Sequence, residues 1–378
     1  MRAALLLVAA LAAGGARSQP ADSLAARLDA AVRAYHDAGR FDGVVLVVEG
    51  GPDDVRVLYE GAFGLADRAW GVPMTPDVRF PFASITKQVA AVMAHQFEMD
   101  GLLDLDAPVA RYVPGLVAGG DSVLVRHLLN HSSGLPFISE TEAEDVAPYG
   151  CPIYEVAADS LADPVELVRQ FASGPLQSVP GETVRYSNTD TIVLQAVMEA
   201  VTGEPFESLL QARILDPLGM ADSGLLRPDT VVERLVETYE GDGPPGCFAT
   251  WRLGAAGAMV GTAADLARFD LALMAGAILP PERLVELWAS SPETTYAAQG
   301  AWSYPKTVGE ARVRVIERTG LIAPFNGLNV LLPESGRAIV VLKSAGDADL
   351  FALSYRPGLP DDLVRVLFGQ PTTGLAND

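Results

Sequence analysis

The tetrapeptide Ser84-Ile85-Thr86-Lys87 places a hydroxyl group and an amine three residues apart. Apolar residues follow it at helical spacing until Gly101, which predicts a helix that begins at Ser84. Residues three apart share one face of a helix, so the Lys87 amine can reach the Ser84 hydroxyl. The exposed N–H groups and the dipole at a helix start also favour negative charge there. The same residues also fit a plain helix cap followed by a surface lysine.

Lysine is scarce in this chain, because Lys87, Lys306 and Lys343 are its only lysines. A second Ser-x-x-Lys, Ser303-Tyr304-Pro305-Lys306, has a proline that disfavours a helix before its lysine, and we interpret it as a chance match. Lys87 can act as a base near neutral pH only if its pKa falls by about three units, which burial or a neighbouring cation can cause.

Other nucleophile and metal patterns are weak. The Gly-x-Ser-x-Gly elbow of α/β-hydrolases is absent. His127 and His131 lie four apart, which would put both on one helix face, but no carboxylate is placed between them as in a zinc-protease helix. We therefore expect no metal site.

Two later segments extend the pattern. The turn Pro180–Glu182 leads to Tyr186-Ser187-Asn188 ahead of a helical pattern, and Arg318-Thr319-Gly320 ends a predicted strand. The order Ser-x-x-Lys, Tyr-x-Asn, basic-Thr-Gly resembles the serine β-lactamase and penicillin-binding family. The branch that it is most similar to holds class C β-lactamases, D-alanyl-D-alanine carboxypeptidases and related esterases. Further segments typical of that family, over residues 22–368, are His127–Pro136, Asp216–Met220 and Gly261–Phe269.

The resemblance implies an acyl-enzyme mechanism in which Ser84 attacks a carbonyl carbon. Lys87 and Tyr186 would share the proton transfer, and Asn188 would orient Lys87 and the substrate amide. Backbone N–H groups of Ser84 and Leu321 would hold the oxyanion. The substrate would also meet Thr319 and Gly320. Neither a metal nor an organic cofactor is implied.

Two residues depart from the family pattern. The family usually has Lys or His before Thr-Gly, whereas this chain has Arg318, which keeps the charge and can bind a carboxylate but cannot give up a proton. Leu321 is bulky where this branch often has a small residue. The substrate stays open among peptidoglycan peptides, β-lactams and simple esters. The alternative is a catalytically retired relative that binds or senses cell-wall fragments.

Strand patterns lie at both ends of the chain and predict an α+β fold with one antiparallel sheet. Residues 19–378 would form a single catalytic domain, with an α/β part at about 19–83 and 276–378 and a mostly helical part at about 84–275. Helices are expected at 21–39 and 361–368. The expected strands are 44–48, 55–59, 311–318, 328–332 and 338–342.

The chain has 48 acidic and 27 basic residues, a formal net charge of −21. The absence of any basic run argues against nucleic acid and anionic lipid as partners, and leaves a small molecule or peptide as the expected one. The acid excess fits salt adaptation, in which salt screens carboxylate repulsion. Codon bias would explain arginine over lysine, but not the acid excess.

Residues 1–18 resemble a signal peptide, with a short positive start, an apolar run and small residues before Gln19. We expect export to the periplasm or the medium, and we find no later apolar run long enough to span a bilayer. In an oxidising compartment Cys151 and Cys247 could pair or stay as free thiols. The acidic stretch Ser139–Asp163 resembles an insertion.

Overall fold

The computed structural model describes residues 23–137, 163–227, 229–237, 250–322, 325–350 and 357–375. The signal-peptide segment, both cysteines and nearly all of the acidic stretch Ser139–Asp163 lie outside these residues. Asp163, the last residue of that stretch, is the N-cap of a helix.

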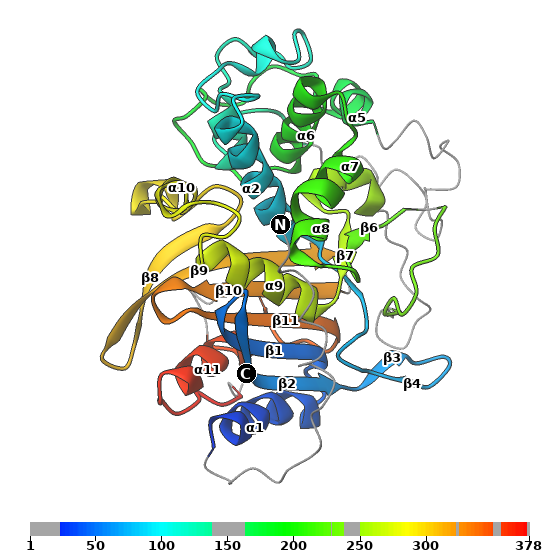
Figure 1. Ribbon diagram of the computed structural model, residues 1–378, viewed down its shortest axis with the longest axis vertical. Coiled ribbons are helices and arrows are strands. Elements are labelled where there is room, and N and C mark those ends of the chain that lie inside the picture. The colour runs from blue at the N-terminus through cyan, green and yellow to red at the C-terminus, as the bar shows by residue number, and fades with distance from the viewer. Residues whose placement is uncertain are drawn as a thin grey trace.

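A six-stranded antiparallel sheet in the order β2-β1-β11-β10-β9-β8 forms the centre of the molecule (Figure 1). Both ends of the chain contribute to it, so the predicted α+β class with an antiparallel sheet is confirmed. The strands are β1 (Asp42–Gly51), β2 (Asp54–Phe63), β8 (Trp302–Val308), β9 (Ala311–Ile322), β10 (Phe325–Leu332) and β11 (Arg337–Ala345).

The sheet is buried on both faces. Alternate residues of β1 serve different cores: Val44 and Leu46 face one, and Val45 and Val47 face the other. The reason is that successive side chains of a strand point to opposite faces of a sheet. A strand covered on both sides therefore has a continuous apolar sequence, as Val44–Val48 does.

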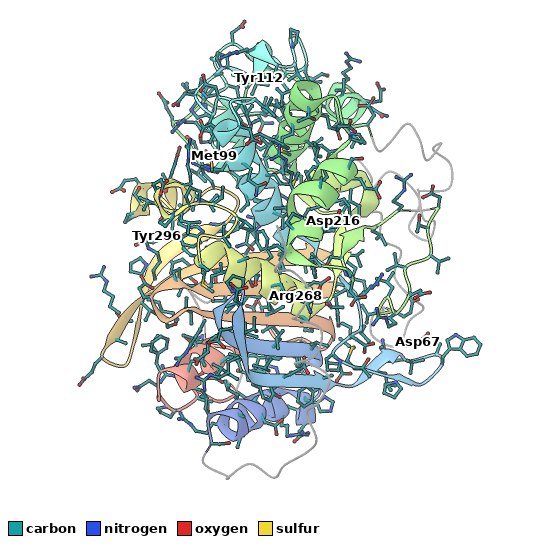
Figure 2. The ribbon with its side chains drawn as sticks, in the orientation of Figure 1. Asp67, Met99, Tyr112, Asp216, Arg268 and Tyr296 are labelled. Atoms are coloured by element: carbon teal, nitrogen blue, oxygen red, sulfur yellow. The ribbon has the colours of Figure 1, made fainter. Side chains whose placement is uncertain are left out.

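Helices cover the two faces. In Figure 1, α1 and α11 lie together on one side of the sheet, and α9 crosses the other side next to α8. Figure 2 labels Arg268 on α9 and Met99 at the outer end of α2. The described helices are α1 (Leu24–Asp37), α2 (Thr86–Met99), α3 (Val125–Leu129), α5 (Pro164–Phe171), α6 (Asn188–Thr202), α7 (Phe206–Leu210), α8 (Asp216–Leu218), α9 (Ala263–Met274), α10 (Pro281–Leu287) and α11 (Leu359–Leu367).

Short elements connect these layers. Two small antiparallel sheets pair β3 (Leu65–Asp67) with β4 (Val72–Pro73), and β7 (Met259–Gly261) with β5 (Phe80–Pro81) and β6 (Gly224–Leu225). The 3₁₀ turns η2 (Ala83–Ile85) and η7 (Thr250–Ala256) contact each other and α2. Among the described residues, no helix is both long and apolar enough to cross a membrane.

Two sequence expectations need correction. Strand β8 was not predicted from the sequence periodicity. This strand contains the whole second Ser-x-x-Lys segment. Within that segment Lys306 forms an ion pair of 2.8 Å with Asp361. His127 and His131 do not share a helix face, because α3 ends at Leu129 and His131 adopts a left-handed conformation with φ of 61°.

A buried polar network joins α9 to the sheet. The Asn329 amide of β10 donates to Asp270 Oδ1 at 2.7 Å and to Gln88 Oε1 at 3.0 Å. Asp270 is fully buried, and no basic residue pairs with it in the described part of the chain. Burial therefore raises the pKa of Asp270 well above its usual value, opposed by the Asn329 hydrogen bond.

Because of the buried Asp270 carboxyl, the stability of the folded protein should depend on pH. The unfolded Asp270 carboxyl ionises near pH 4, whereas the folded one stays protonated to higher pH. Its contribution to stability is thus present below about pH 4 and is lost as the pH rises through the folded pKa. Asp270→Asn keeps the shape and cannot ionise, so its melting temperature should exceed that of the wild type by an amount that grows as the pH rises above about 4.

Thermal unfolding of both proteins across that pH range measures the difference, with the exposed Asp121→Asn as the control. A melting-temperature difference that stays constant with pH would show that Asp270 is not a neutral acid in the folded protein.

Candidate active site

Ser84 lies in the turn η2, two residues before α2 begins. The preceding Ala83 has a φ of 46°, a left-handed conformation that costs free energy for any residue with a Cβ. Two contacts hold it there: the Phe82 N–H donates to Met259 O at 2.8 Å, and Thr86 Oγ1 donates to Ala83 O at 2.7 Å. The turn leaves Ser84 partly exposed between buried neighbours.

Lys87 is buried in the first turn of α2, with 2% of its surface exposed. Its ammonium donates three hydrogen bonds, to Ser84 Oγ at 3.2 Å, Asn188 Oδ1 at 2.8 Å and Ala256 O at 2.5 Å. Burial lowers the pKa of Lys87 to about 8, against the raising effect of Tyr186 and with further lowering by Arg318. The lysine that sequence analysis selected is thus neither a surface residue nor an ordinary ammonium.

Tyr186 contacts the serine directly, and Asn188 contacts both Tyr186 and Lys87. The Tyr186 hydroxyl lies 2.6 Å from Ser84 Oγ and 3.2 Å from Asn188 Oδ1, and Asn188 is the first residue of α6. Burial alone would raise the pKa of Tyr186, but the positive charges of Lys87 and Arg318 outweigh it and lower the pKa to about 8. Two candidate proton acceptors therefore touch the same hydroxyl.

The end of β9 passes directly beside this cluster. Arg318 Nε donates to the backbone oxygen of Ser84 at 2.9 Å, and the Arg318 side chain is 1% exposed. Thr319 is partly exposed and Leu321 is 47% exposed, so both lie at the surface next to Ser84. All eight residues that sequence analysis assigned to catalysis or substrate binding thus belong to one cluster or to the strand beside it.

Gly320 sets how closely β9 approaches the turn that carries Ser84. A Cβ atom at this position would lie 2.1 Å from the Phe82 carbonyl oxygen, far inside van der Waals contact. Only glycine allows this approach without a shift of one backbone against the other.

Sequence analysis missed several neighbours. Trp302 of β8 lies against Tyr186, with ring centroids 6.1 Å apart, and its strand was not predicted. The buried His131 ring packs edge-on against Tyr186 at 4.8 Å, and His131 Nδ1 lies 3.5 Å from Asp190 Oδ2. Burial lowers the pKa of His131 and raises the pKa of Asp190, which favours the neutral form of each.

One group of potential metal ligands occurs among the described residues, away from Ser84: His95, Glu98 and Glu286. Arg283 Nη1 already lies 2.6 Å from Glu98 and 3.1 Å from Glu286. An arginine thus provides the positive charge that a cation would otherwise supply.

Solved structures of similar fold are hydrolases and a penicillin-binding protein. The D-amino acid amidase of Ochrobactrum anthropi SV3 superposes with a TM-score of 0.70 at 28% identity, covering 92% of this chain and 100% of that one. A D-stereospecific amidohydrolase from Streptomyces sp. gives 0.66 at 26% identity, covering 85% and 95%. A penicillin-binding protein from Bacillus halodurans gives 0.69 at 24% identity, covering 84% and 96%, and supports the fold alone.

Curated relatives agree with this group. Esterase EstB of Burkholderia gladioli is 36% identical over 239 residues, which are 60% of this chain and 57% of the esterase. Penicillin-binding protein 4* of Bacillus subtilis (strain 168) is 29% identical over 201 residues, 52% of this chain and 40% of that protein. The chain therefore matches only about half the length of these relatives. The family model described as Beta-lactamase matches residues 28–352, so the chain belongs to the Beta-lactamase family, with its esterases, penicillin-binding proteins and carboxypeptidases.

Proposed function

We propose that this protein is a serine hydrolase that cleaves an ester, amide or peptide bond through an acyl-enzyme on Ser84. The observation that carries the proposal is the pair of contacts on Ser84 Oγ, 2.6 Å from the Tyr186 hydroxyl and 3.2 Å from Lys87 Nζ. A serine hydroxyl is a weak nucleophile until a neighbouring base accepts its proton, and both neighbours have a pKa of about 8.

In the proposed reaction the Ser84 oxygen bonds to the substrate carbonyl carbon while its proton passes to the Tyr186–Lys87 pair. That proton then goes to the leaving group as the scissile bond breaks. Asn188 keeps Lys87 oriented through its 2.8 Å bond. The backbone N–H groups of Ser84 and, by resemblance to the family, Leu321 bind the oxyanion. Water, activated by the same pair, then releases the acyl group.

For the substrate we favour a carboxylesterase or peptidase over a dedicated β-lactamase. One relative of this chain is named an esterase, and one solved structure of similar fold is named a D-amino acid amidase. Leu321, 47% exposed beside Ser84, also offers an apolar surface to an acyl or leaving group. Hydrolysis of p-nitrophenyl esters but not of nitrocefin would support this choice, and the reverse would contradict it.

Covalent labelling tests the nucleophile. A fluorophosphonate probe should label the wild type and leave Ser84→Ala unlabelled. Lys87→Met should slow labelling by about 10²–10⁴-fold, the usual loss when general-base help is removed. The second Ser-x-x-Lys supplies matched controls, Ser303→Ala and Lys306→Met, which should label like the wild type. An unlabelled wild type with intact fold would favour the retired binding protein instead.

The close approach of β9 gives a second prediction. Gly320→Ala should push β9 away from the Ser84 turn, because its Cβ has no room beside Phe82 O. We expect labelling to slow by about 10²-fold, the typical loss when one oxyanion donor moves out of place. Gly51→Ala is the control for a glycine change, since its φ lies outside the left-handed region and a Cβ there meets no atom within 4 Å. Unchanged labelling in Gly320→Ala would show that strand placement does not control the reaction.

We also propose that the protein is exported and that its first 18 residues are removed. The short positive start and apolar run of this segment support the proposal. Amino-terminal sequencing of the protein from the native host should read from Gln19, and recovery of the intact Met1 terminus would contradict it. Non-reducing thiol alkylation of the same sample would show whether Cys151 and Cys247 are paired.

A further inference from the structure

Arg318 is the least expected group of the site, because it is a large, permanently charged side chain that is almost fully buried. It is 1% exposed, its terminal nitrogens Nη1 and Nη2 are buried, and among the described residues Tyr186 is the side chain whose interaction offsets its desolvation. No described carboxylate forms an ion pair with it. A buried charge of this kind needs compensation from its immediate neighbours.

Its neighbours are the catalytic groups themselves. Nε donates to the backbone oxygen of Ser84 at 2.9 Å, and the guanidinium carbon lies 4.9 Å from the Tyr186 ring centroid and 4.7 Å from that of Trp302. A guanidinium is planar and weakly hydrated, so it can lie against two aromatic rings while one N–H bonds to a carbonyl. A lysine ammonium has no flat face for this arrangement.

We propose that Arg318 is a positioning residue that fixes the backbone of the nucleophile and keeps a constant positive charge beside Tyr186, and that it does not bind a carboxylate of the substrate. The inference rests on the proposed function, since it assigns Arg318 a role toward Ser84 and Tyr186. It departs from the carboxylate-binding role expected from the sequence, because the terminal nitrogens that would bind a carboxylate are buried.

The other charged and titratable groups around Tyr186 show how the positive charge of Arg318 differs from theirs. Lys87 of α2 has its Nζ 5.1 Å from the Tyr186 ring centroid, and the His131 ring, whose Nδ1 lies 3.5 Å from Asp190 Oδ2, packs edge-on against the same ring. Burial favours the neutral forms of His131 and Asp190, and Lys87 loses its charge as the pH rises. Arg318 keeps its charge throughout this range, so it is the constant source of the field that favours the phenolate.

Two consequences follow for the enzyme. A substrate needs no anionic group, and esters with neutral leaving groups should react as readily as acidic ones. Loss of the Arg318 charge should raise the pKa of Tyr186, so that the phenolate forms only at higher pH. The acidic limb of the pH–rate profile should then move upward by about one to two pH units, from the Coulomb energy of one charge at this range.

The test uses Arg318→Gln, with Arg318→Lys as the variant that keeps the charge and the exposed Arg314→Gln on the same strand as the control. The substrates are the phenylacetyl esters of 3-hydroxybenzoate and of 3-hydroxybenzamide, which share a shape and differ in charge. Arg318→Gln should lower kcat on both esters by the same factor, about 10²-fold, and slow fluorophosphonate labelling equally. Arg318→Lys should recover part of each loss, and Arg314→Gln should match the wild type.

A spectroscopic measurement checks the same role without turnover. The tyrosinate absorbance of the wild type minus that of Tyr186→Phe should titrate at lower pH than the same difference in the Arg318→Gln background. Loss confined to the benzoate ester, with labelling and the Tyr186 titration unchanged, would overturn the inference.

Two further results separate a failure of this inference from a failure of the proposed function. If Arg318→Gln does not fold, equal losses on both esters in Arg318→Lys support the inference and a loss on the benzoate ester alone overturns it. A wild type that the probe does not label overturns the proposed function and this inference together. Normal wild-type labelling with an unaffected Arg318→Gln overturns the inference alone.

Discussion

The burial of the Lys87 ammonium is the constraint on which the site depends. A charge removed from water is tolerated only when its hydrogen bonds are satisfied, and Lys87 meets its acceptors from three separate segments. These are the turn with Ser84, the start of α6 at Asn188 and the backbone of η7 at Ala256. The three segments are far apart in the sequence, so the ammonium fixes their relative positions. Ser84 stands where it does because its hydroxyl is one of the three acceptors.

The charges of the cluster explain why proton transfer is shared. Lys87 and Arg318 are both buried, and neither has a carboxylate within hydrogen-bond distance among the described residues. Ionisation of Tyr186 is therefore the change that best relieves this excess of positive charge. Tyr186 and Lys87 both have a pKa of about 8 and they contact the same atoms, so they titrate as a coupled pair. In the proposed reaction the pair, and not one residue, accepts the serine proton.

The sequence predicts those parts of the molecule that depend on local pattern. The strands at both ends, the helix after Ser84 and the Tyr186–Asn188 motif are continuous segments, and their residues carry the signal themselves. Strand β8 was missed because its sequence, Trp302–Val308, contains a proline and lacks regular alternation. The Ala256 acceptor was missed because a backbone carbonyl has no side-chain signature. The left-handed Ala83 and the contact at Gly320 depend on distant chain segments, which no local pattern encodes.

Arg318 shows how the tertiary environment decides a role that residue type leaves open. An exposed arginine beside the nucleophile would select anionic substrates, whereas this one is covered by Tyr186 and Trp302. The same charge then acts inward, on the nucleophile and its base. The residues of β9 that lie at the surface beside this turn are Leu321 and, in part, Thr319. In the proposed enzyme, the choice of substrate at this strand therefore depends on shape and apolar contact, and the charge serves the chemical step.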